Sequence, residues 1–245
     1  MADELRFPRP ATDFRLYYVE QAPLFRGLSR AQCSQIVAFA REQRVGRKQC
    51  FFVEGEPAEE VCVLGSGRVK ITQLTAMGHQ IILRLTGPGE VFGGLGVVSG
   101  AFHSSTAEAL EPSHALVWPR RGLEELAEHI PALQRNALRI VSERLRHLEQ
   151  RYSELATERV GQRLARALLR LVGQIGRPSQ GSVLVSLTRD ELAQLTGTTQ
   201  FTVSRLLCEW ESRGLVTPRR EGVLIDDGPG LVALAEVGED PSDPS

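Results

Sequence analysis

Residues 131–158, PALQRNALRIVSERLRHLEQRYSELATE, form a long helical pattern on which the rest of the chain is organised. Large apolar residues recur in it at alternating spacings of three and four: Leu138, Val141, Leu145, Leu148, Tyr152 and Leu155. This is an a/d heptad seam with arginines and glutamates around it. A seam this narrow on a polar helix predicts a parallel homodimeric coiled coil that joins an input domain to an output domain. The alternative is a helix that packs only on its own domain.

The composition is that of a globular protein with two modest domains. The chain has 245 residues and a net charge of −1, so any basic surface must be local. No apolar run approaches the roughly 20 residues of a membrane span, and the N-terminus has no signal-peptide pattern. We therefore expect a cytoplasmic protein without a membrane partner.

The four cysteines are scattered and include no C-x-x-C pair: Cys33, Cys50, Cys62 and Cys208. This spacing argues against a metal site, and a disulfide framework is not expected in the cytosol. We expect all four to be buried as small hydrophobic side chains.

Short runs rich in valine, isoleucine and leucine alternate with Gly/Pro turns between about residue 44 and residue 118. They are centred on residues 51–53, 61–64, 69–72, 81–85, 91–92, 105–109 and 115–118. Many short strands with such turns predict a closed antiparallel structure, and this length suits a jelly-roll-like β-roll. Residues 121–129 are expected to form a short helix that leads into the long one.

The stretch 188–207, TRDELAQLTGTTQFTVSRLL, is a strong helix-turn-helix signal. Gly197 permits the turn, Ala193 is small where the helices cross, and a basic hairpin that contains Arg219 and Arg220 follows as a wing. Residues 176–181 are expected to be a loop. The predicted DNA contacts are Thr188, Arg189, Thr199, Gln200, Phe201, Thr202, Ser204, Arg205, Arg219 and Arg220. For Phe201, packing inward against the neighbouring helix is the alternative.

The local charge supports this prediction. Residues 158–225 contain ten arginines and six acidic residues, so this part of the chain is basic although the whole is not. The alternative to a DNA-binding motif is a helical hairpin that serves only as a protein scaffold.

From about Leu24 to Val232 the chain resembles the Crp–Fnr family of bacterial transcription regulators. The resemblance rests on LFRGL at 24–28, GSGRVK at 65–70, GPGEVFG at 87–93, TAEAL at 106–110 and TVSRLL at 202–207. It implies an α+β fold with an N-terminal antiparallel β-roll, a long dimerisation helix and a C-terminal winged helix-turn-helix. The expected boundaries are 1–130 for the helices and β-roll, 131–158, 159–237, and 238–245 for a disordered tail.

The resemblance also implies an effector pocket, but this chain departs from the family's cyclic AMP site. Where those relatives have a ribose-binding Glu, this chain has Gly94, and their phosphate-binding Arg-Ser pair appears as His103-Ser104. The base-contacting Thr-Ser pair aligns with Leu148-Glu149. Cyclic AMP is therefore disfavoured. Any ligand is expected among Gly93, Gly94, Leu95, Gly96, His103, Ser104, Ser105, Leu148 and Glu149.

The sequence also bears on two other cofactors of the family. Residues 1–32 contain no cysteine, which disfavours an N-terminal iron–sulfur cluster. Haem stays open, with His79, His103, His114, His129 and His147 as candidate ligands. A cavity filled by the protein's own side chains is a further alternative.

We predict a homodimeric DNA-binding transcription regulator that reads a palindromic site in double-stranded DNA and responds to an unknown small-molecule effector. The resemblance adds RNA polymerase as a partner. No nucleophile–base pair, phosphate loop or metal motif indicates an enzyme. The alternative is a ligand-binding regulatory or metabolic protein whose C-terminal helices only mediate assembly.

Overall fold

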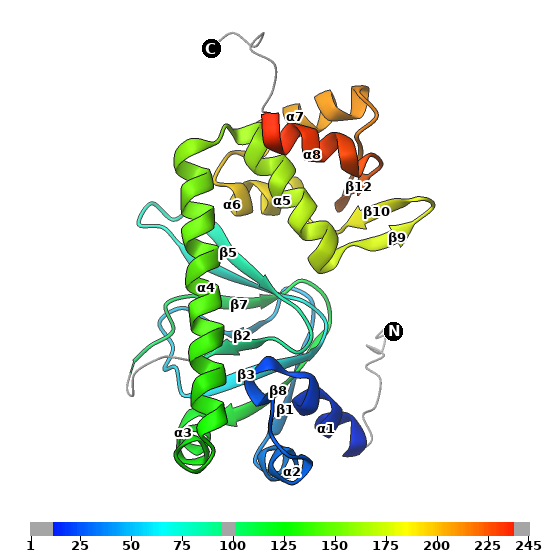
Figure 1. Ribbon diagram of the computed structural model, residues 1–245. Helices are drawn as coiled ribbons and strands as arrows, with labels where there is room; N and C mark the ends of the chain where they lie inside the picture. The colour runs from blue at the N-terminus through cyan, green and yellow to red at the C-terminus, as the bar shows by residue number, and fades with distance from the viewer. Residues whose placement is uncertain (1–11, 95–100, 238–245) are drawn as a thin grey trace, which may run out of the picture. The chain divides into compact units, whose positions relative to one another are not determined.

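The computed structural model describes residues 12–94 and 101–237 (Figure 1). The chain divides into two compact units, residues 1–146 and 147–245. The predicted tail at 238–245 lies outside the described residues, as do residues 1–11. No helix in the described part of the chain is long and apolar enough to cross a bilayer.

The first unit contains two four-stranded antiparallel sheets, as the short apolar runs predict. One has the order β1-β8-β3-β6 and the other β2-β7-β4-β5. Their strands are β1 (Arg41–Val45), β2 (Cys50–Phe52), β3 (Glu60–Ser66), β4 (Val69–Leu74), β5 (Gln80–Thr86), β6 (Val91–Gly93), β7 (Thr106–Ala109) and β8 (Ser113–Pro119). Because apolar side chains from both sheets share one buried cluster, among them Leu64, Ile71 and Phe92, the sheets enclose a core. The antiparallel β-roll is confirmed.

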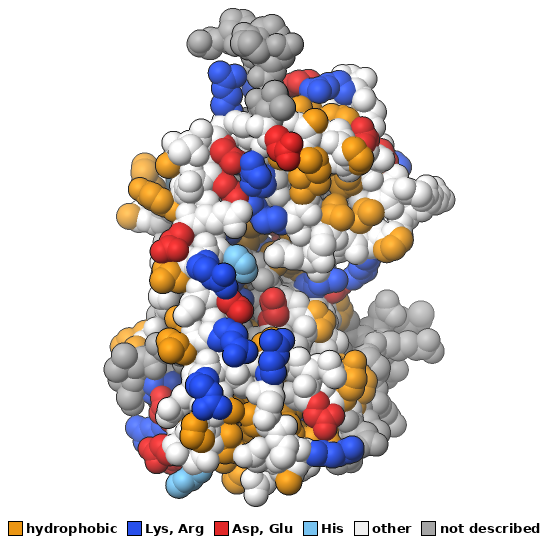
Figure 2. Space-filling model, viewed as in Figure 1, with side chains coloured by type: hydrophobic (Ala, Val, Ile, Leu, Met, Phe, Trp, Pro, Cys, Tyr) orange, Lys and Arg blue, Asp and Glu red, His pale blue; other side chains and the backbone are white. Residues whose placement is uncertain are grey.

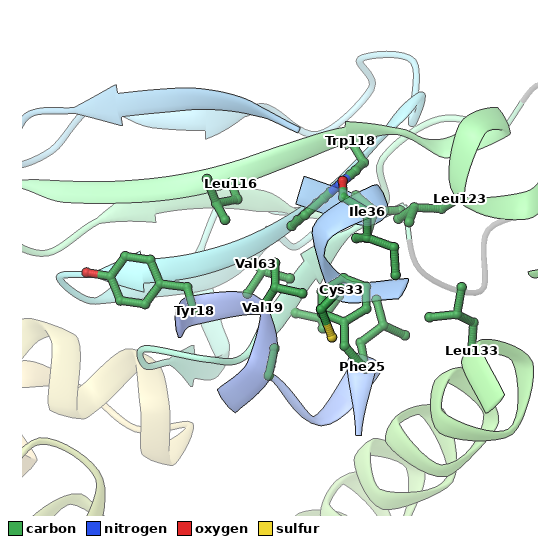
Figure 3. Close-up of a cluster of buried hydrophobic side chains, with 14 of the residues drawn as sticks. Tyr18, Val19, Phe25, Cys33, Ile36, Val63, Leu116, Trp118, Leu123 and Leu133 are labelled. Carbon is green, nitrogen blue, oxygen red and sulfur yellow. The ribbon is translucent and has the colours of Figure 1, made fainter. Parts of the chain in front are cut away.

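The helices of this unit build a second apolar cluster against the outer face of β3 and β8 (Figure 3). They are α1 (Thr12–Gln21), the 3₁₀ turn Pro23–Phe25, α2 (Arg30–Ala38), α3 (Arg120–His129) and the start of α4 (Pro131–Thr157). Ser29 begins α2 with a capping box, in which its hydroxyl accepts from the Gln32 amide. Trp118 lies in this cluster and donates its indole N–H to the Ile36 carbonyl at 2.8 Å.

The predicted long helix is α4, which ends one residue earlier than expected. All six seam side chains are exposed in the protomer, by between 38% and 73%. On the opposite side of its first turns Leu133 and Asn136 are buried and Ala137 is partly buried. Figure 2 shows orange hydrophobic and blue cationic side chains mixed on the outer surface of the first unit.

The second unit is built from short elements after α4. They are α5 (Val160–Ile175), β9 (Arg177–Ser179), β10 (Ser182–Val185), α6 (Arg189–Thr196), α7 (Gln200–Ser212), β11 (Val216–Arg219), β12 (Gly222–Ile225) and α8 (Gly228–Val237). The strands form one antiparallel sheet, β11-β12-β10-β9. The helix-turn-helix and its hairpin wing are both present (Figure 1).

Three sequence predictions differ from the structure. The expected loop at 176–181 contains β9, an edge strand, where Pro178 costs no sheet hydrogen bond. Helix α8 was not predicted, and it is held by the buried side chains of Leu231, Leu234 and Ala235. Cys33 and Cys62 are buried as expected, but Cys208 is exposed on α7 and Cys50 is only half-buried.

A buried polar bond fixes the start of α4. The Asn136 amide donates to the carbonyls of Leu24 and Arg26, at 3.0 and 2.9 Å. Replacing Asn136 with the larger Leu keeps the branching of the side chain but leaves two carbonyls without this donor, which should destabilise the first unit by about 1–3 kcal/mol.

Urea unfolding can measure this in a Trp210→Phe background, where Trp118 is the sole remaining tryptophan and reports on the first unit. The neighbouring exposed residue provides the control, since Arg135→Ala should change stability by no more than about 0.5 kcal/mol. Equal stabilities for Asn136→Leu and Arg135→Ala would contradict the anchoring role.

Candidate functional site

Helix α6 begins and ends with strong local signals. The Thr188 hydroxyl accepts from the Glu191 amide at 3.2 Å, and the Glu191 carboxylate accepts from the Thr188 amide at 2.9 Å. This capping box satisfies two amides that the first helical turn leaves open. The helix ends at Gly197, which adopts a left-handed conformation with φ of +65°. Glycine suits this turn because it has no Cβ to clash there.

Helix α7 presents one buried and one exposed face. Thr199 caps it by accepting from the Thr202 amide at 3.2 Å, and the two hydroxyls lie 3.0 Å apart. Val203, Leu206, Leu207 and Trp210 are buried. Phe201 is 88% exposed, so the alternative that it packs inward is wrong. Gln200 and Arg205 are exposed as well.

The hairpin β11–β12 carries Arg219 and Arg220 at its exposed tip. Asp226, just after β12, accepts from Ser182 at 2.6 Å and from Thr217 at 2.7 Å, and so ties the hairpin to β10. Arg189 and Ser204 are partly exposed. The ten predicted DNA contacts therefore all belong to the second unit, and two of them, Thr188 and Thr199, have a clear structural role as helix caps.

Two arginines that the sequence did not single out hold the turn between α6 and α7. Arg151, on α4, donates to the Leu195 carbonyl. Arg163, on α5, donates to the Thr196 carbonyl at 3.2 Å and to the Glu158 carbonyl at 2.8 Å. Since the carbonyls of Leu195 and Thr196 lie at the end of α6, the guanidinium groups position the turn from which α7 begins. No local pattern reveals this, because both partners are distant in sequence.

In the first unit, the predicted pocket residues Gly93 and Gly94 lie in a crowded place. A Cβ added to Gly93 would come within 2.8 Å of the Glu60 carbonyl. At Gly94 the same carbonyl would be 3.0 Å away and that of Ala58 would be 3.1 Å away. Backbone atoms cannot withdraw as a flexible side chain can, so a larger residue at either position requires the backbone to move.

His103 is buried and its ring stacks on that of Phe52, with the centroids 3.7 Å apart and an interplanar angle of 7°. Burial lowers the pKa of His103, and the carboxylates of Glu56 and Glu60 only partly oppose the effect. The imidazole is therefore less inclined to carry a positive charge at neutral pH than an exposed histidine.

The remaining predicted pocket residues are not brought together in one described site. Leu95 and Gly96 lie outside the described residues. Leu148 and Glu149 belong to the second unit, whereas Ser104 and Ser105 belong to the first. Among the five histidines, His103 and His114 are buried and the other three are exposed. Within the described ranges no group of three His, Cys, Asp or Glu side chains is placed to hold a metal ion.

Comparison with known proteins agrees with this architecture. Residues 42–129 match the family model of the cyclic nucleotide-binding domain, and residues 162–234 match that of the Crp-like helix-turn-helix domain. Together they cover more than half of the chain. The chain belongs to the Crp–Fnr family of bacterial transcription regulators.

Individual Crp–Fnr relatives match over most of their length. A CRP-like cAMP-activated global transcriptional regulator of Mycobacterium tuberculosis is 28% identical over 217 residues, which are 88% of this chain and 97% of the relative. The structure of FixK2 from Bradyrhizobium japonicum is 26% identical with a TM-score of 0.69, covering 80% of this chain and 96% of that one. The global regulator CLP of Xanthomonas campestris shares the fold, with a TM-score of 0.73 at 20% identity and coverage of 80% and 99%.

Proposed function

We propose that this Crp–Fnr protein is a homodimeric, sequence-specific DNA-binding transcription regulator that works in the cytoplasm and engages RNA polymerase. The observation that carries the proposal is the exposed side of α7, where Gln200, Phe201 and Arg205 follow a capped turn. The wing adds Arg219 and Arg220. A capped helix with exposed polar and aromatic groups, flanked by cations, suits a major groove and the phosphates beside it.

The seam supports the dimer. Its six apolar side chains are exposed in the protomer, and the heptad spacing matches a second copy of the same helix. A parallel pair would place two reader helices in successive major grooves, about 34 Å apart, on an imperfect palindrome.

Leu145→Asp tests the dimer, because a partner helix would have to bury the introduced carboxylate against apolar neighbours. We expect the dimer dissociation constant to rise at least about tenfold and DNA binding to weaken with it. Light scattering after size exclusion measures the first effect and fluorescence anisotropy the second. Arg146→Ala, next to the seam, should leave both unchanged. A Leu145→Asp protein that stays dimeric would remove the seam from the proposal.

We propose that Arg205 reads a guanine, since its fork matches the two major-groove acceptors of that base. Many relatives carry a Glu where this chain has Phe201. A phenyl ring accepts no conventional hydrogen bond from a base edge, but it packs well on the methyl group of thymine. The base pair read at that position is therefore expected to differ from that of relatives with the Glu.

Substitutions on α7 test which bases are read. Arg205→Ala should cost about 1–3 kcal/mol on the specific site and much less on random DNA. Arg213→Ala, at the other end of α7, is the matched control. Phe201→Glu should shift preference toward cytosine at one symmetric position in each half-site, whereas Phe201→Ala should relax that position. Selection from a randomised duplex pool reports all four. An unchanged motif for Phe201→Glu would mean that this side chain does not face the bases.

We further propose that the input is not cyclic AMP, although the Mycobacterium tuberculosis relative is cAMP-activated by name. The support is chemical. Gly94 supplies no carboxylate for the ribose, its surroundings crowd a larger side chain, and the buried His103 is a poor substitute for a permanent cation. Titration calorimetry of the full-length protein with cyclic AMP should show no binding at micromolar concentrations. Tight binding would overturn this interpretation of Gly94 and His103.

A ligand-binding regulatory or metabolic protein whose C-terminal helices only mediate assembly is the competing function. It predicts no heparin retention and no salt-dependent shift of duplex DNA. The proposed regulator predicts both, because phosphate contacts release counterions and make affinity fall with salt.

A further inference from the structure

A cavity of about 350 Å³ lies where α3 meets the start of α4 in the first unit. Much of its lining is apolar and comes from Leu24, Val61, Leu123, Ala127, Leu133 and Ala137. These six residues belong to the outer cluster or pack against it, and none of the six belongs to the core between the two sheets. Leu123 and Leu133 lie at the end of the outer cluster away from Tyr18 (Figure 3). The cavity therefore differs from the predicted effector pocket, with which it shares only Gly94.

Hydrogen bonds hold the walls of this cavity in place. The Gly94 amide donates to the Glu60 carbonyl at 2.8 Å, and the Arg120 amide donates to the Glu59 carbonyl at 2.7 Å. These two bonds fix the end of β6 and the start of α3 beside β3. The Asn136 side chain, through its two carbonyl partners, fixes the first turns of α4. Walls held in this way form the cavity before a ligand arrives, as is usual for small-molecule sites.

Small side chains leave the space open. Ala127 follows Leu123 by one turn of α3, and Ala137 follows Leu133 by one turn of α4. Gly94 adds no side chain from the end of β6. The volume is at the lower end of the range of small-molecule pockets, so it suits a body such as a phenyl ring with a short chain.

The charged side chains of the lining are one arginine and two glutamates, all on α3. Arg120 is buried, and its guanidinium pairs with the Glu124 carboxylate at 3.4 Å. Glu128 lies one turn beyond Glu124, and both glutamates are exposed at the opening. Since the Arg120–Glu124 pair is neutral as a whole, Glu128 gives the lining a net charge of −1. A carboxylate beside an apolar cavity favours a ligand with a cationic group and disfavours an anion.

We propose that this cavity binds a small organic cation with an apolar body, which packs against Leu123 and Leu133, and an ammonium group, which lies at Glu128. Burial of the body supplies most of the affinity, because apolar area is removed from water. The exposed carboxylate adds less, since water screens it, but it selects the charge of the ligand. The site does not depend on the proposed function, because nothing in it requires DNA binding.

The test uses the full-length protein without DNA and three probes that share a phenyl body and differ in the head group: phenethylamine, phenethyl alcohol and hydrocinnamate. Thermal unfolding is followed by Trp118 fluorescence in the Trp210→Phe background at equal ionic strength. At about a tenfold excess over its dissociation constant, phenethylamine should raise the melting temperature by about 4 °C. It should bind about two- to fivefold more tightly than the neutral alcohol, as an exposed ion pair allows, and hydrocinnamate should bind most weakly.

Substitutions in the lining separate the body from the charge. Ala137→Phe fills the cavity and should abolish the shift with all three probes, and Ala127→Leu carries the same comparison if that variant does not fold. Glu128→Gln should keep the shift with the alcohol and lose the preference for the amine. Glu125→Gln, on α3 and exposed but outside the lining, should keep that preference.

Three results would overturn the proposal. The first is that no probe raises the melting temperature of the parent protein, or that hydrocinnamate raises it more than phenethylamine does. The second is that Glu128→Gln prefers the amine as strongly as Glu125→Gln does. The third is that the protein with a filled cavity still responds like the parent, which would place the bound probes elsewhere.

Discussion

The turn at Gly197 is the constraint on which the second unit depends. Its left-handed backbone sets the direction in which α7 leaves α6, and the end of α6 is held by guanidinium groups from two other helices. A Cβ at Gly197 would also approach the Leu155 side chain to 3.1 Å, so the turn packs closely on α4. The direction of the exposed face of α7 is therefore determined by backbone geometry and carbonyl partners more than by the residues that face outward.

The first unit uses polar groups differently. In its outer cluster two side-chain donors meet backbone carbonyls at helix ends, as Trp118 does at Ile36 and Asn136 does at Leu24. Such bonds add modest net stability, but they are costly to leave unmade in a buried place, so they select one arrangement of α2 and α4.

The sequence was sufficient where the determining contacts are local. Thr188, Gly197 and the heptad spacing in residues 131–158 act within a few residues, and the corresponding elements are confirmed. It was insufficient where a distant partner decides. The bulge between Ile71 and Thr72 alters the β4–β5 register, so simple alternation along IILRLT does not show which face Arg84 occupies. Arg151 and Arg163 resemble solvated helix charges until the carbonyls of Leu195 and Thr196 are brought beside them.

Helix α4 has an outward and an inward face, and the spacing of its apolar residues indicates only the outward one. The outward face is the seam. The inward face begins apolar with Leu133 and Ala137 and then becomes charged, with Arg144, Arg151 and Glu154 at helical spacing. In the first unit Arg144 holds the carbonyl of Val91 beside the predicted input region. In the second, Arg151 holds a carbonyl of the reader turn, and Glu154 pairs with Arg170 at 2.6 Å. Long guanidinium side chains tolerate small helix movements, but a rotation of α4 that changed the seam register would have to exchange these bonds. The seam residues and the inward-bonding residues of each unit therefore lie on the same helix.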